Sequence, residues 1–424
     1  MAQRTLLIGC GYEDAVDSNI KRSDLALSLA LAALTDNPNM ASQSTICILE
    51  NKIKPAALRA LHRWFVENYI ERHQHNRPSE IILDFDGSCS PVHGNQEGSA
   101  YHGYYKTNML FPLFVYDQHG WLIAAVLRQG TESEDKIIVS ELKRIVAELR
   151  AKWPKVKIII RADAGVYNPK ICDWCEKNNV FYILRIQSAG HGGGGMRVHS
   201  DKAAALAAIQ FVKAFGQERY ISSKVTKCKL EAQFKKLPSK KQRKLKLAEL
   251  ETRIVRVYHE FHYQSGMSDN DKKRWKRPRR ILTACTHTDW GGERTFFVTN
   301  ICAGTAENII KTLYNRRGEM ELSIRDMKAL NCTRLSCQRF EANQFRLLLH
   351  GLAYLFLLCL RRLLPPSLRS LSIASIQKYL IRMPARISQT SREFLLHWDS
   401  SFSWPRQFFQ LLKNIGRIPS PLRC

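Results

Sequence analysis

The stretch Tyr314–Lys328, YNRRGEMELSIRDMK, carries polar residues at spacings that are typical of one face of a helix. Tyr314, Arg317, Glu321 and Lys328 are separated by steps of three, four and seven residues. At about 100° per residue, the four positions lie within an arc of roughly 60° and along roughly 21 Å. The stretch is therefore predicted to be a helix that places one carboxylate between two cations and a phenol. The alternative is a solvated face with one salt bridge.

Two apolar, strand-like runs upstream each end in an aspartate. SEIILDFDG ends at Asp86, and VKIIIRADAG ends at Asp163. An Asp at the carboxyl end of a strand, followed by a glycine turn, lies where metal ligands and substrates meet in such sheets. Together with Glu321, two strands and a helix would supply three carboxylates, which suit a pair of hard divalent cations. A helix N-cap is the alternative for Asp163, but Pro169 follows at too great a distance.

Several blocks of the sequence match one known family in the correct order. The pattern Tyr-x2-Arg-x3-Glu-x6-Lys with the two aspartates resembles the signature of bacterial insertion-sequence DDE transposases of the cut-and-paste type, and most of all the branch called transposase DDE domain group 1. Further blocks that resemble this branch are GYEDAVDSN, LDFDGSCSPVHGNQEG, LRQG, RADAGVYN and RLSCQRFEANQFRLLLHGLAYLF. The resemblance covers nearly the whole chain and is weakest from 190 to 290 and after 365.

The resemblance implies a set of site residues and a reaction. Asp86, Asp163 and Glu321 would be catalytic and would bind Mg²⁺ or Mn²⁺, as two ions, whereas Tyr314, Arg317 and Lys328 would bind DNA phosphates. The reaction would be hydrolysis at the element ends, which frees a 3′-hydroxyl, followed by its attack on target DNA. The partners would be double-stranded DNA, as terminal inverted repeats and target, and a second copy of the chain in a paired-end complex.

The first metal ligand has to be chosen between Asp84 and Asp86. Strand alternation places both side chains on the same face, so periodicity does not separate them. The family has a small residue and then Ser or Thr after its Asp, which matches Asp86-Gly87-Ser88. Asp86 is therefore the predicted ligand, with Asp84 as a supporting acid. In the block that follows, His93 either touches the substrate or is a turn residue held by the backbone.

The fold class predicted from the order of elements is α/β. Three strands, a helix, a strand, a helix and a strand between 80 and 188 are typical of a ribonuclease-H-like mixed sheet. The other predicted parts are a helical N-terminal region at 1–79 with a helix-turn-helix as one interpretation, a basic and largely β insertion at 189–301, the catalytic and packing helices at 302–363, and a basic helical tail at 364–424. Relatives are expected to carry a longer arm before the GYEDA block.

Charge and composition point to nucleic acid. The 424 residues carry a formal net charge of +27. The segment 187–300 holds 24 Lys and Arg residues against 10 Asp and Glu, whereas 1–80 holds nine of each. Such an excess favours a polyanionic partner, and clustered cations beside Trp275 and Tyr258 suit phosphate contact with base stacking.

The remaining composition argues for a reduced, membrane-free setting. The twelve cysteines form no disulfide framework and suit a cytoplasmic protein near the bacterial nucleoid. The longest apolar run, Leu347–Leu360, contains His350 and is shorter than the about 20 residues that a membrane span needs. It is predicted to be a buried helix. Two rival functions remain: a nuclease of the same fold without strand transfer, and an inactive DNA-binding remnant of a transposase.

Overall fold

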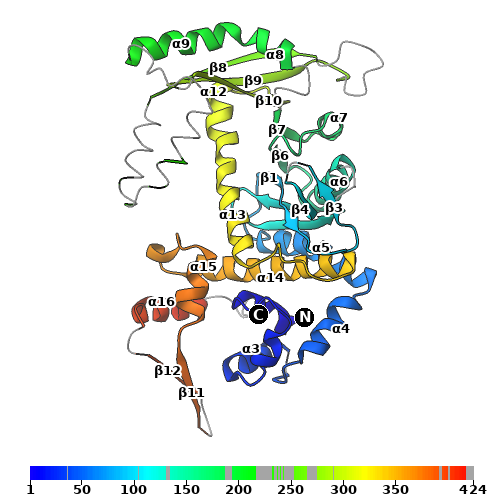
Figure 1. Cartoon of the computed structure of the whole chain (residues 1–424), viewed down its shortest axis with the longest axis vertical. Coiled ribbons are helices and arrows are strands. Elements are labelled where there is room, and N and C mark those ends of the chain that lie inside the picture. The colour runs from blue at the N-terminus through cyan, green and yellow to red at the C-terminus, as the bar shows by residue number, and fades with distance from the viewer. Residues whose placement is uncertain are drawn as a thin grey trace. The chain divides into compact units, whose positions relative to one another are not determined.

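The structure is a computed structural model that forms two compact units (Figure 1). The first unit comprises residues 1–79, 86–156 and 318–424, and the second comprises 80–85 and 157–317. Each unit is described by itself. The residues that the structure describes are 1–35, 37–103, 105–129, 134–186, 193–215, 232–233, 236, 239, 242, 253–264, 275–289, 291–390, 394–399 and 402–416.

The first unit begins with helices. Ser42 caps one of them, since its hydroxyl accepts a hydrogen bond from the Thr45 amide, and Pro55 occupies the first turn of the next, where its missing N–H costs nothing. A helix is therefore present at Gln43–Asn51, within the region predicted to be helical, while the helix-turn-helix interpretation stays a prediction. The helices are α1 (Ala2–Gly9), α2 (Asp17–Ile20), α3 (Leu25–Thr35), α4 (Gln43–Asn51) and α5 (Pro55–Arg72).

Strand β4 is the centre of the antiparallel sheet in the first unit. It pairs with β2, β3 and β5, and α6 follows them in the chain. Strands β4 and β5 are near-continuous apolar runs, and both are almost fully buried. The bounds are β2 (Ser90–Pro91), β3 (Ala100–His102), β4 (Thr107–Asp117), β5 (Leu122–Arg128) and α6 (Glu134–Lys152).

Helix α14 (Phe340–Leu363) packs on β5 and forms the core of the first unit. The Gln344 amide accepts a hydrogen bond from the Leu127 N–H at 2.5 Å and donates to the Ala125 carbonyl at 3.0 Å. Among the described residues, α14 is the one helix long and apolar enough to cross a membrane. However, 72% of its most apolar 18-residue stretch is buried inside the protein. The prediction of a buried helix at 347–360 is therefore confirmed.

The second unit contains a mixed sheet in the order β1-β6-β7-β10-β9-β8. Its first three strands are parallel and the remaining pairs are antiparallel. Helices α8 and α9 belong to the same unit, and α9 packs on β8 and β9. The bounds are β1 (Glu80–Gly87, with its last two residues in the first unit), β6 (Lys157–Ala162), α7 (Pro169–Lys177), β7 (Phe181–Ile186), α8 (Gly193–His199), α9 (Asp201–Phe215), β8 (Ile254–Tyr263), β9 (Arg279–Thr288) and β10 (Gly291–Thr299).

The predicted fold class is confirmed. Along the chain the elements β1, β4, β5, α6, β6, α7 and β7 follow in the ribonuclease-H-like order, and the insertion contributes three strands. These strands continue the sheet of β7, because β10 pairs with β7 from Phe296 to Thr299. His191, most of the basic run at 234–251 and the first three residues of the basic run at 272–280 lie outside the described residues.

The predicted regular helix at 314–328 is wrong in its first turn. The chain is helical from Ala306, but it passes through α12 (Ala306–Asn308), the π-helix η1 (Ile309–Tyr314) and the 3₁₀ turn η2 (Asn315–Arg317) before α13 (Gly318–Ala329). The Thr312 hydroxyl donates to the Asn308 carbonyl at 2.7 Å, a back-bond that bends helices, and Gly318 weakens the junction. The spacing of 100° per residue therefore holds for Glu321 and Lys328 but not for Tyr314 and Arg317.

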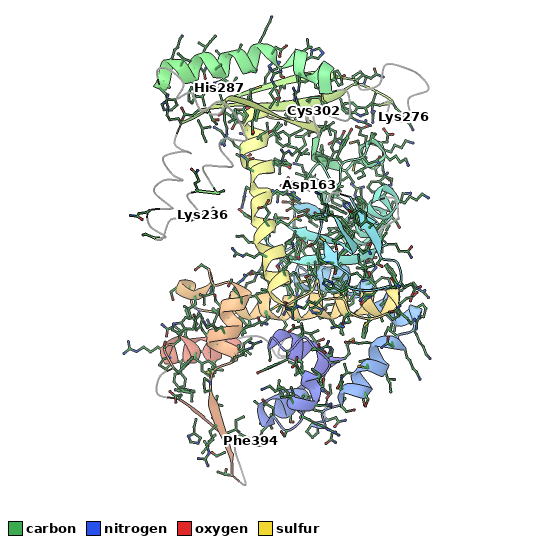
Figure 2. All side chains as sticks on the ribbon, viewed as in Figure 1. Asp163, Lys236, Lys276, His287, Cys302 and Phe394 are labelled. Carbon is green, nitrogen blue, oxygen red and sulfur yellow. The ribbon has the colours of Figure 1, made fainter. Side chains whose placement is uncertain are left out.

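The C-terminal region differs from the helical tail expected there. It contains the antiparallel hairpin of β11 (Ala385–Gln389) and β12 (Phe394–Trp398), because ARISQ alternates polar and apolar residues as strands do. Phe394, labelled in Figure 2, is exposed on this hairpin. The other elements are η3 (Pro366–Leu368), α15 (Ile373–Ile376), η4 (Gln377–Ile381) and α16 (Pro405–Gly416).

Candidate active site

A buried ion pair joins the two strands that carry the predicted aspartates. In the parallel register, Asp84 of β1 lies beside Arg161 of β6. Arg161 donates from Nε to Asp84 Oδ1 at 2.7 Å and from Nη2 to Oδ2 at 2.6 Å, and its Nη1 donates to the Leu313 carbonyl at 2.6 Å. Both residues are about 1% exposed. Since both Asp84 oxygens bind Arg161, this acid joins the two strands, and the choice of Asp86 as the ligand stays a prediction.

Asp163 is the first residue after β6 and is half-buried (Figure 2). Its Oδ1 accepts hydrogen bonds from the amides of Gly165 at 3.0 Å and Val166 at 3.3 Å. A Cβ on Gly165 would stand 3.3 Å from that same oxygen, so the turn is fitted closely to the carboxylate. The amides fix the orientation of the side chain, and Oδ2 takes part in neither of these bonds.

Tyr314 lies within electrostatic reach of other predicted site residues of the second unit. Burial raises the pKa of its phenol above the ordinary value, the charges of Arg317 and Arg185 lower it, and those of Asp163 and Asp84 raise it. The ring packs on Phe297, with a centroid distance of 4.4 Å. The second unit therefore brings together Asp163, Tyr314 and Arg317, and it adds Arg185.

Asp86 is half-buried where β1 enters the first unit. A Cβ on the next residue, Gly87, would lie 2.3 Å from the Phe111 ring and 3.0 Å from Arg128, so only glycine fits without displacing these side chains. The Asp86 charge adds to the increase in the pKa of Tyr116, which is caused first by burial. The Asp86 carboxylate is therefore close enough to Tyr116 of β4 for its charge to act on the phenol.

Glu321 and Lys328 are both exposed residues of α13. They are seven residues apart, which is close to two helical turns, so they share a face. The Lys328 charge lowers the pKa of Cys89 and of Cys332, although burial is the larger effect and raises both, that of Cys332 to about 12. Lys328 is therefore near the segment that follows Asp86.

The predicted set is divided between the units. Asp86, Glu321 and Lys328 belong to the first, and Asp163, Tyr314 and Arg317 to the second. Within the described ranges, no three His, Cys, Asp or Glu side chains are grouped so that they could hold a metal ion. The three acids nevertheless supply carboxylate oxygens, the donors that Mg²⁺ and Mn²⁺ prefer.

Sequence reasoning missed Arg161 and Arg185. A signal for Arg161 was present, because Asp84 and Arg161 each stand two residues before a predicted ligand, Asp86 or Asp163, and the two strands pair in parallel. Equal offsets predict that the two side chains are neighbours on one face. No local pattern distinguishes Arg185.

Comparison with known proteins identifies one family. The sequence model of the protein family described as "Transposase DDE domain group 1" matches residues 1–191 and 193–420 of the chain. No curated protein matches the chain. Similar solved structures include the piggyBac transposase synaptic complex with hairpin DNA, which is 10% identical with a TM-score of 0.35 over 88% of this chain and 66% of that one. The catalytic domain of Mos1 mariner transposase is 15% identical with a TM-score of 0.19 over 48% of this chain and 92% of that one.

Proposed function

Because the chain belongs to the transposase DDE domain group 1 family, we propose that it is the DNA transposase of a bacterial insertion sequence. It would cleave the element at its terminal inverted repeats and join the freed ends to target DNA, as a homodimer in a paired-end complex. The formal charge of +27 supports a DNA partner. The protein would act in the bacterial cytoplasm, at the nucleoid.

The observation that carries the proposal is the position of two aspartates on a parallel strand pair. The last pair in the β1–β6 register is Phe85 with Ala162, and the next residue of each chain segment is Asp86 or Asp163. Strand ends of parallel sheets are the usual location of such ligands. Asp86, Asp163 and Glu321 are the proposed catalytic residues and the proposed ligands of two Mg²⁺ or Mn²⁺ ions.

The proposed roles of the other residues follow from their chemistry. Bound divalent ions would neutralise charge on the scissile phosphate and favour deprotonation of the attacking water. Arg317 offers a planar fork of donors for phosphate oxygens, and Lys328 offers a mobile point charge. The Tyr314 hydroxyl, with its pKa raised by burial, stays protonated and would donate a hydrogen bond near the scissile end.

Two displacements at phosphorus complete the proposed reaction. In the first, a water oxygen attacks the phosphorus at the element end, and the bond to the 3′ oxygen breaks, which leaves a 3′-hydroxyl. In the second, that hydroxyl oxygen attacks a target phosphodiester, and the target 3′ oxygen leaves.

A cleavage assay with Mg²⁺ on DNA that carries the element ends tests the proposal. Asp86→Asn, Asp163→Asn and Glu321→Gln should each abolish cleavage while DNA binding is retained, because they remove a ligand charge without changing size. Near-full activity of any variant would show that its residue is not a ligand. Pre-cleaved ends should be joined to target DNA; cutting without joining would indicate the nuclease alternative, and no cutting at all an inactive remnant.

A further inference from the structure

A pocket of about 480 Å³ lies within the first unit, and Asp86, Glu321 and Lys328 are not among its lining residues. Four segments line it: the GYED block, the loop after Asp86, the loop after Lys328 and, with Arg346, helix α14. Pro91 follows Asp86 by five residues, and Thr333 follows Lys328 by five. The lining residues are Glu13, Asp14, Pro91, His93, Gln96, Thr333, Arg334, Leu335, Ser336 and Arg346.

Hydrogen bonds between the two loops hold the walls of this pocket in place. The Ser90 hydroxyl donates to the Thr333 carbonyl at 2.6 Å. The Glu97 amide donates to the Gln338 carbonyl at 3.0 Å, and the Glu97 carboxylate accepts from the Phe340 amide at 3.0 Å. The walls are therefore already formed, which lowers the entropic cost of binding.

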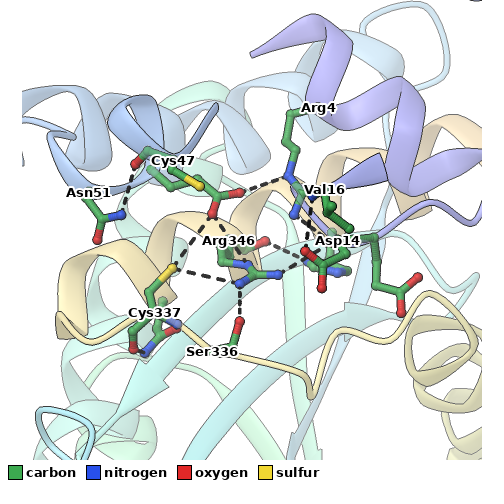
Figure 3. A network of polar contacts seen from close by, with 12 residues as sticks. Arg4, Asp14, Val16, Cys47, Asn51, Ser336, Cys337 and Arg346 are labelled. Atoms are coloured by element: carbon green, nitrogen blue, oxygen red, sulfur yellow. Dashed lines mark hydrogen bonds and ion pairs between the residues drawn. The ribbon is translucent and has the colours of Figure 1, made fainter. Parts of the chain in front are cut away.

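Buried arginines bind the backbone of the GYED block (Figure 3). Arg4 donates from Nε to Glu50 at 2.8 Å and from Nη2 to the Glu13 carbonyl at 2.6 Å. Arg346, which is 7% exposed, donates from Nη1 to the Ser336 hydroxyl at 2.6 Å. The backbone of Glu13 and the loop at Ser336 are therefore tied to one rigid base.

The lining includes two carboxylates, the guanidinium groups of Arg334 and Arg346, and the Gln96 amide. The Glu13 carboxylate is paired with Arg334 Nη1 at 2.9 Å, and the Asp14 carboxylate is exposed and accepts from the Val16 amide at 3.2 Å. The side-chain oxygen of Gln96 is buried and has no hydrogen-bond partner among the described residues. Two carboxylates disfavour an isolated phosphate, whereas a ligand with adjacent N–H donors and one carbonyl would suit these acceptors and the Arg334 guanidinium.

We propose that this pocket binds an unpaired guanine of the DNA strand, an inference that rests on the proposed function. The Watson–Crick edge of guanine carries two adjacent donors, N1–H and the 2-amino group, beside the O6 acceptor. Thymine, adenine and cytosine each offer only one donor position on that edge. In a duplex the edge is occupied by cytosine, so the base has to leave the stack to be read. The side chains of Pro91 and His93 are exposed, and the guanine ring would stack on them.

The test compares short single strands of thymidine that carry one central guanine, inosine or adenine, bound to the full chain and followed by fluorescence anisotropy. Inosine lacks only the 2-amino group, so the guanine strand should bind about tenfold more tightly than the inosine strand. Asp14→Asn and Gln96→Met should reduce that preference to less than about twofold, since each removes an acceptor. Glu71→Gln, which removes an exposed charge elsewhere in the unit, should leave it unchanged.

Equal binding of the guanine and inosine strands, or a preference that survives both pocket variants, would overturn the proposal. Thermal unfolding of each variant separates lost recognition from lost folding, and Asp14 is exposed, so Asp14→Asn should fold normally. Asp163→Asn belongs to the other unit and should keep the guanine preference while it loses cleavage. A guanine preference without any cleavage by the unmodified protein would refute the transposase proposal but not the pocket.

Discussion

Each of the two proposed sites, the catalytic site and the guanine pocket, has a buried group of arginine and carboxylate side chains close to it in the sequence or in its lining. The two groups differ in the number of guanidinium groups around the acid. In the second unit Asp84 faces one guanidinium, with both oxygens bonded at 2.6 to 2.7 Å. In the first unit Glu50 faces two, Arg4 at 2.8 Å and Arg346 at 3.8 Å. In the first group one guanidinium binds both oxygens of the acid and joins two strands. In the second group two guanidinium groups approach one acid, and one of them, that of Arg346, also lines the pocket.

The largest expected effect comes from breaking the balanced pair. Arg161→Met leaves the Asp84 carboxylate buried without its guanidinium and the Leu313 carbonyl without its donor, so the free energy of unfolding should fall by about 3–5 kcal/mol. Urea denaturation followed by tryptophan fluorescence measures the loss.

The same two strands provide a matched control for this change. Lys157 of β6 pairs with Glu80 of β1 at 2.8 Å, but the two side chains are 46% and 40% exposed. Lys157→Met should therefore cost less than about 1 kcal/mol. If the free energy of unfolding fell equally in the two variants, burial would not be the reason why the Asp84–Arg161 pair contributes to stability.

How far each group could be predicted from sequence follows from the distance between its members along the chain. The strands ending at Asp86 and Asp163 were predicted from apolar runs, and the equal offsets of Asp84 and Arg161 within those runs could have paired the two residues, although the pair was missed. Glu50 bonds Arg4 across 46 residues and Cys337 across 287, and no periodicity connects such positions. The π-turn at Tyr314 was also missed, because a helical spacing rule assumes the regular geometry that the turn interrupts.

The second expected effect is acid sensitivity of the first unit, through His350. Its Nδ1–H donates to the Arg346 carbonyl at 2.8 Å, and burial, with smaller effects from Arg346 and Arg4, lowers its pKa from 6.5 to about 3. Between pH 6.5 and 3 the unfolded chain binds a proton that the folded chain does not. The contribution of His350 to the free energy of unfolding is therefore fully present above pH 6.5. It falls with decreasing pH, by about 3 kcal/mol at pH 4.

His350→Asn measures this contribution, because its amide can still donate to the carbonyl but does not titrate. The difference in unfolding free energy between this variant and the unmodified protein should shift in favour of the variant as the pH falls from 7 to 4. His93→Asn changes an exposed histidine and is the control. Parallel pH curves for the His350 variant and the unmodified protein would contradict the assigned cause.

The smallest expected effect is in the unbalanced group, where one guanidinium exceeds the available acid. Arg346→Met leaves the Arg4–Glu50 bond intact and frees the exposed Ser336 hydroxyl to bond water, so it should cost less than about 1.5 kcal/mol at pH 7. The Arg346 charge also lowers the pKa of His350, so its removal should raise that pKa and weaken the acid sensitivity. Urea denaturation at pH 7 and pH 4 measures both effects. A loss as large as that of Arg161→Met would mean that Glu50 needs both arginines, and that the two groups do not differ in charge balance in the way the distances indicate.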